Sequence, residues 1–100
     1  MNMQKLMKQM QQAQVKQAEM QERLDGMEIV GSAGGGMVKV TCNGAGQVSK
    51  LNVDKMVVDP DDVEALEDLI LVAIQDAQTK ANEAQQAEMS KLMSGMPSLR

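Results

Sequence analysis

The chain has 100 residues, a formal net charge of −4, one cysteine, and no His, Phe, Tyr or Trp. This length supports one domain and not two. The lack of histidine and of a second cysteine excludes an intrachain disulfide, most nucleophile–base pairs and most zinc sites. We therefore expect a protein that is not an enzyme and holds neither a metal nor a cofactor.

Without aromatic side chains, which bury large areas, a core of Val, Ile, Leu, Ala and Met is thin. Association with a second copy buries more apolar surface, so we expect a homodimer. No N-terminal segment resembles a signal peptide. The longest apolar stretch, Leu69–Ile74, is too short to span a bilayer. We expect a cytoplasmic protein that has neither a membrane nor a small-molecule substrate as a partner.

Residues 1–25 are predicted to form a helix that Gly26 ends as a C-terminal cap. Gln, Lys, Ala and Met, all good helix formers, dominate this segment. Its apolar residues recur three and four positions apart, as in a heptad repeat, with one polar interruption at Gln17. The members of this seam are Met3, Leu6, Met10, Ala13, Met20, Leu24 and Met27.

Residues 27–54 are predicted to form a three-stranded antiparallel meander with one polar face. In the second strand Val38, Val40 and Cys42 alternate with polar residues and therefore share one face. The apolar alternation of the third strand slips after Val48, which predicts a bulge near Ser49 or Lys50. The strands span 27–33, 37–43 and 47–54, and glycine-rich turns at 34–36 and 43–46 separate them.

Residues 60–94 are predicted to form a long helix, with Asp59 as its N-cap and Pro60 at its first position. Its first half is apolar nearly all round, which indicates burial on several sides. No helix-breaking residue follows until Gly95, and residues 95–100 are predicted to be a frayed tail.

The predicted element order is α-β-β-β-α, which belongs to the α+β class. At about 1.5 Å per residue the two helices are roughly 36 Å and 50 Å long, and they must project beyond a compact domain of this size. We expect them to pair antiparallel, which would bring Met3–Met10 beside residues 84–93, so that two methionine clusters meet at one tip. The dimer interface is predicted in the strands and the apolar half of the last helix, at Val38, Val40, Leu51, Val53, Leu66, Leu69, Ile70, Ala73 and Ile74.

Residues 1–25 carry four basic and three acidic side chains, which makes them the one part of the chain suited to a polyanion. Their basic residues have two equal interpretations, a solvated helix face or a set of phosphate contacts. Because the chain has no aromatic side chain to stack on bases, DNA binding would depend mainly on phosphates. The candidates are Lys5, Lys8, Lys16 and Arg23.

Two further patterns have structural explanations. The acidic run from Asp59 to Asp68 lacks the spacing of a calcium loop, and helix capping explains it better. The stretch Gly31–Gly36 lacks the Gly-Lys-Ser/Thr ending of a phosphate-binding loop and joins two strands, so it is predicted to be a hairpin turn.

Over essentially its whole length the chain resembles the YbaB/EbfC family of nucleoid-associated proteins. The resemblance is carried by the element order and by Gly31–Thr41, Asn43-Gly44, Val53-Asp54, Leu66–Leu69 with Asp76-Ala77 in an Ala-rich helix, and the closing Met-Ser-Gly-Met-Pro.

The resemblance implies a cytoplasmic homodimer, located at the bacterial nucleoid and shaped like tweezers. It implies helical arms that contact double-stranded DNA, alter its conformation and affect gene expression. The alternative function is a protein-interaction module that grips another protein with Met-rich helical tips.

Overall fold

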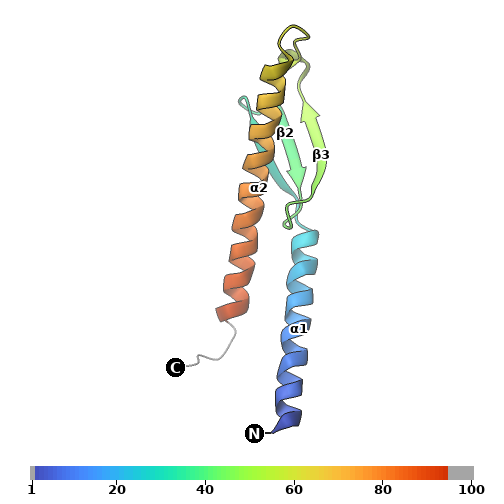
Figure 1. The fold of residues 1–100 in the computed structure, drawn as a ribbon, viewed down its shortest axis with the longest axis vertical. Helices are drawn as coiled ribbons and strands as arrows, with labels where there is room; N and C mark the ends of the chain where they lie inside the picture. Colours follow the sequence, from blue (N-terminus) through green and yellow to red (C-terminus); the bar gives the residue numbers. More distant parts are fainter. Residues whose placement is uncertain (1, 95–100) are drawn as a thin grey trace.

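The computed structural model describes residues 2–94, so the predicted tail at 95–100 and the first residue of the predicted helix lie outside the described residues. The element order is α-β-β-β-α, as predicted, with one additional short 3₁₀ helix (Figure 1). The elements are α1 (Met3–Asp25), β1 (Ile29–Ala33), β2 (Val38–Cys42), β3 (Val48–Val53), η1 (Lys55–Val57) and α2 (Val63–Ser94).

The three strands form one antiparallel sheet in the order β1-β2-β3, which confirms the predicted meander. Gly34, Gly35 and Gly36 join β1 to β2 with φ values of 63°, 69° and 93°, a conformation that favours glycine. The predicted bulge is at Ser49, because Lys50 pairs with Thr41 whereas Val48 pairs with Cys42.

The core lies between α2 and the two strands β1 and β2. Val38, Val40 and Cys42 are buried, as the alternation in β2 predicted, and they face Ala73 and Ala77 of α2. The Cys42 thiol donates a hydrogen bond to the Ala77 carbonyl at 3.6 Å. Small side chains on α2 therefore let this helix lie close to the sheet.

Gly31 of β1 makes this close approach possible. A Cβ atom at this position would lie 2.2 Å from the backbone nitrogen of Ala77 and 2.5 Å from the Ala73 oxygen. Real Cβ atoms essentially never come this close to backbone atoms. The sequence signal for this contact is one glycine in the predicted strand, opposite a run of alanines in the predicted helix.

Side chains of α2 also cap the outer edge of β1. The Ser32 N–H donates to Asp76 Oδ2 at 2.9 Å, and Lys80 Nζ donates to the Val30 carbonyl at 3.1 Å. Lys80 Nζ also lies 3.1 Å from Asp76 Oδ2. The Ser32 N–H, followed by Lys80, lowers the pKa of Asp76 below its usual value. Two backbone groups of this edge, the Ser32 N–H and the Val30 carbonyl, are thus bonded within the chain and are not free to pair with another strand.

The start of the last helix was predicted too early, because α2 begins at Val63 and not at residue 60. The Asp62 carboxylate accepts a hydrogen bond from the Ala65 N–H at 3.2 Å, as an N-cap residue does. Asp59 instead closes a turn, since its side chain accepts from the Asp61 N–H and its carbonyl from the Asp62 N–H, both at 3.0 Å. The turn and η1 carry the chain from β3 back across the sheet, which postpones the helix.

The expected meeting of the two methionine clusters was wrong. α1 lies antiparallel to α2, but Arg23 of α1 contacts Glu88 of α2, and Lys16 shares a shallow hollow with Leu92. α2 therefore ends beside Lys16, and the first half of α1 continues beyond it (Figure 1). The register follows from the sheet, because the Gly44 N–H donates to the Leu24 carbonyl at 2.7 Å and so anchors the end of α1 at the second hairpin.

The molecule measures 70 × 24 × 16 Å, with a radius of gyration of 19.7 Å. A compact domain of this length would have a radius of gyration of about 13 Å. The projection of both helices beyond the sheet is thus confirmed. Among the described residues, no helix combines the length and the apolar character that a membrane crossing requires.

Candidate nucleic-acid interface

The exposed N-terminal part of α1, residues 3–15, is called here the free half of α1. Asn2 caps it by accepting a hydrogen bond from the Gln4 N–H at 3.1 Å. From residue 2 to residue 18 the sequence contains Lys5, Lys8 and Lys16 and no acidic residue. This stretch is therefore strongly cationic, although the whole chain is acidic.

Three of the four predicted basic residues follow one side of α1. Lys16 and Arg23 are seven positions apart, and Lys5 is three turns before Lys16, so the helical repeat aligns them. Because Arg23 and Lys16 both lie against α2, this basic stripe is on the side of α1 that faces α2. Beyond the end of α2, Lys5 continues the stripe, and Lys8 lies to one side of it.

The structure engages Arg23 with a carboxylate that the sequence analysis did not identify. Arg23 donates from Nε at 3.2 Å and from Nη2 at 3.0 Å to Oε2 of Glu88. Glu88 is only 4 % exposed, and Lys91 Nζ lies 3.8 Å from its other oxygen. The hydrogen bonds from Arg23 lower the pKa of Glu88. Of the predicted basic residues, Arg23 is thus the one whose charge is already balanced inside the chain, and the three lysines have no ion-pair partner among residues 2–94.

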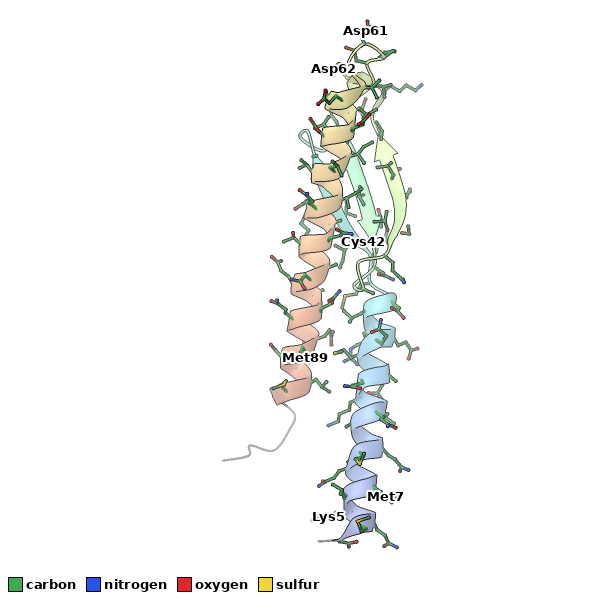
Figure 2. The ribbon with its side chains drawn as sticks, viewed as in Figure 1. Lys5, Met7, Cys42, Asp61, Asp62 and Met89 are labelled. Atoms are coloured by element: carbon green, nitrogen blue, oxygen red, sulfur yellow. The ribbon has the colours of Figure 1, made fainter. Side chains whose placement is uncertain are left out.

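A cluster of acidic charge lies far from these lysines. Asp59, Asp61, Asp62 and Glu64 surround the start of α2, and Figure 2 shows Asp61 and Asp62 at the opposite end of the molecule from Lys5. The long axis measures 70 Å, whereas screening at 0.1 M salt acts over about 10 Å. The acidic end therefore does little to repel a polyanion that approaches the free half of α1.

The predicted interface residues fall into two groups. Val38, Val40 and Ala73 have no exposed surface in a single chain, because they form the core beneath α2. The other six are at least partly accessible, among them Leu51, which is 47 % exposed. These six are Leu51, Val53, Leu66, Leu69, Ile70 and Ile74.

The accessible group belongs to an uncovered apolar surface. α2 covers β1 and β2 but does not extend over β3, so the side of β3 that continues the core face remains open. On this side Val48 and Leu51 are exposed, and Ile70 and Ile74 of α2 are half-buried at the margin of the core. We call these four residues the β3–α2 strip. The sequence analysis missed Val48, whose alternation is interrupted by the bulge at Ser49.

Within residues 2–94, no group of three or more Asp, Glu or Cys side chains is placed to hold a metal ion. Cys42 is buried, and burial raises the pKa of its thiol, which disfavours the reactive thiolate.

The model of the YbaB/EbfC DNA-binding family matches residues 1–96 of the chain. The chain is 52 % identical over 98 residues to the nucleoid-associated protein TTHA1599 of Thermus thermophilus, covering 96 % of this chain and 92 % of that protein. It is 50 % identical over 97 residues to a nucleoid-associated protein of Deinococcus radiodurans, covering 97 % and 98 %.

A crystal structure of the uncharacterized protein HP0035 from Helicobacter pylori has the same fold, with a TM-score of 0.79. It is 23 % identical in sequence, and the alignment covers 95 % of this chain and 99 % of that one. The family is described by DNA binding and not by a catalytic activity. On the match of nearly the whole chain to its model, and on relatives that share half of its residues, the protein belongs to the YbaB/EbfC DNA-binding family.

Proposed function

We propose that the protein binds double-stranded DNA at the nucleoid as a homodimer. It does so mainly through phosphate contacts from Lys5, Lys8 and Lys16 of α1. The two projecting α1 helices of one dimer hold separate parts of a duplex, alter its conformation and thereby affect nucleoid organisation and gene expression. The observation that carries the proposal is the acid-free lysine stretch on a helix that projects beyond the rest of the molecule.

The contacts are to phosphates because the free half of α1 lacks the side chains that stack on bases. It has no aromatic side chain for stacking, and its lysines are point charges on flexible stems. Phosphate contacts position a protein on DNA without reading its sequence. We therefore expect weak sequence preference and strong dependence on salt.

The homodimer is supported by the β3–α2 strip. Its Val48 and Leu51 would leave water if a second copy packed against them, and apolar burial is the main favourable term in association. Asp76 and Lys80 close the outer edge of β1, and among residues 2–94 no side chain of α2 bonds to the outer edge of β3 in this way. The proposed interface is therefore at β3 and the adjoining side of α2.

Light scattering tests the dimer. The wild-type protein is expected to have twice the 10.8 kDa mass of the chain at micromolar concentration. Leu51→Lys should give the single-chain mass, because a lysine that the free chain exposes would be buried without a partner in the dimer. Val15→Lys, which adds the same charge at an exposed apolar residue of α1, is the control and should stay dimeric. A dimeric Leu51→Lys protein would refute this interface.

A gel-shift titration of a duplex at low salt tests DNA binding. The variant with Lys5, Lys8 and Lys16 all changed to Gln should lose binding. The control changes Lys39, Lys50 and Lys55 to Gln, which alters the net charge equally but leaves α1 intact. Equal binding by both variants, or no binding by the wild type, would defeat the proposal.

The alternative function, a grip on another protein formed by both methionine clusters, is not favoured. In the structure α2 ends beside Lys16, and Figure 2 shows Met89 well separated from Met7. The two clusters therefore do not form one tip.

A further inference from the structure

We propose that the uncovered apolar seam on the free half of α1 pairs with the same seam of a second dimer, so that two dimers join two DNA segments. The seam consists of Met3, Leu6, Met10 and Ala13. The pairing itself follows from α1 alone, whereas the joining of DNA segments rests on the proposed function.

The seam is regular, and α2 does not cover its first three members among the described residues 2–94. Its spacing of three, four and three places it on one side of the helix, as in a coiled coil. Met3, Leu6 and Met10 are 68 %, 41 % and 58 % exposed, because α2 ends before it reaches them. In the C-terminal half of α1, by contrast, Leu24 of the same seam is buried. The free half thus repeats an apolar pattern whose members Met3, Leu6 and Met10 are left exposed by residues 2–94.

The positions that flank the seam favour a second copy as its partner. In a paired helix these positions face the flanks of the other helix, and charges there decide which partners are accepted. Within residues 3–15 they are Met7, Gln9 and Gln14, all uncharged, and Lys16 is the first charged residue at such a position. Over residues 3–15 two copies can therefore approach without like charges at these positions, and with amide groups that can bond to one another.

The lysines occupy the outward positions of the same repeat. Lys5 is two residues after Met3, and Lys8 is two residues after Leu6, which places both away from the seam. At about 100° per residue, Lys8 lies opposite the seam, and Lys5 lies about 100° round the helix from Leu6. An α1 that rests on DNA through these two lysines leaves its seam accessible beside that duplex, where a second DNA-bound dimer can meet it.

The strength of the pairing is limited by its length of about two heptads. The helix is formed before it pairs, which lowers the entropic cost. When dimers sit side by side on DNA, the effective concentration of seams rises toward the millimolar range. We therefore expect weak pairing in free solution and cooperative pairing on DNA.

The experiment compares two double variants. The seam variant is Leu6→Gln with Met10→Gln, and the matched control is Val15→Gln with Met93→Gln, two exposed apolar residues outside the seam. Glutamine is a good helix former, so both should keep the helical circular dichroism of the wild type. Each protein is tested for binding to one duplex, for capture of a labelled duplex by a bead-bound one, and, without DNA, for self-association by sedimentation velocity up to millimolar concentration.

We expect the seam variant to bind a single duplex like the wild type but to capture the second duplex about tenfold less, a loss equivalent to 1.4 kcal/mol. Its sedimentation should lack the dimer-to-tetramer shift that the wild type and the control show. Unchanged capture by the seam variant would overturn the proposal. The proposal would also be overturned if the wild type bound DNA, captured no second duplex and stayed dimeric, because the seam would then be available to a different protein and not to a second copy.

Two other outcomes separate this inference from the proposed function. If the seam variant falls apart into single chains, the seam lies within one dimer and the inference fails. If the wild type does not bind DNA, the proposed function fails, and the sedimentation arm alone decides whether the seams pair.

Discussion

Replacement of Gly31 by alanine should destabilise the protein more than any other single methyl addition in the sheet. The new Cβ would lie 2.2 Å from the Ala77 nitrogen and 2.7 Å from the Ala77 Cα atom. These are backbone atoms of a helix, so they cannot move aside as the end of a flexible side chain can. α2 must therefore move away from β1 by roughly an ångström, since such contacts need about 3.5 Å or more.

The cost follows from what this displacement disturbs. Forcing an extra carbon into a packed core costs about 1–3 kcal/mol. Movement of α2 also weakens the 2.9 Å hydrogen bond from the Ser32 N–H to Asp76, a contribution of about 1 kcal/mol. We expect Gly31→Ala to lower the free energy of unfolding by about 2–4 kcal/mol.

Urea unfolding at one protein concentration, followed by circular dichroism, measures this loss. Gly26→Ala is the matched control, because Gly26 has a φ of −87° and a Cβ there would meet nothing closer than 3.6 Å. We expect the control to be neutral or slightly more stable than the wild type. A Gly31→Ala protein that unfolds with the control would show that α2 does not pack on β1 as closely as described.

Three further predictions concern the caps, the ion pair and the thiol. Asp62→Ala should lower the free energy of unfolding in urea by about 1 kcal/mol, because α2 loses its N-cap, and should lower it more than Asp59→Ala does. A larger loss for Asp59→Ala would instead indicate that the helix begins after Asp59. Because the hydrogen bonds from Arg23 lower the folded-state pKa of Glu88, the contribution of this ion pair to stability is present above the ordinary glutamate pKa and is lost as the pH falls through the folded-state pKa. Acid unfolding curves should show this loss of stability for the wild type, and the stability of Glu88→Gln should depend less on pH. Superimposable pH profiles for the two proteins would contradict this role of Glu88. Cys42 should react with a thiol reagent only when urea unfolds the protein, because it is buried, and rapid labelling of the native protein would count against the core described.

Features set by neighbouring residues could be predicted from the sequence. The alternation of Val38, Val40 and Cys42 predicted the buried face of β2, and the slip after Val48 predicted the bulge at Ser49. Both depend on the two-residue repeat of a strand, which the sequence displays directly.

Features set by contacts between distant segments could not be predicted in this way. Arg23 and Glu88 are 65 positions apart, and the residue spacing around each of them gives no sign that the other is its partner. The same holds for Asp76 and Lys80, which bond to the edge of β1. The order of the two helices along the sheet decides these pairs, and with them which basic residues remain available for DNA. Sequence reasoning gave Arg23 the same standing as the lysines, although its charge is balanced by Glu88.

The dependence of DNA affinity on salt tests the central claim most directly. If Lys5, Lys8 and Lys16 of both chains contact phosphates, about six contacts form, and log K should fall against log salt with a slope near −5. The triple Lys→Gln variant of α1 should lose most of this slope, whereas the variant with Lys39, Lys50 and Lys55 changed to Gln should keep it. A slope near zero for the wild type, or the same reduced slope for both variants, would contradict the assignment of DNA binding to α1.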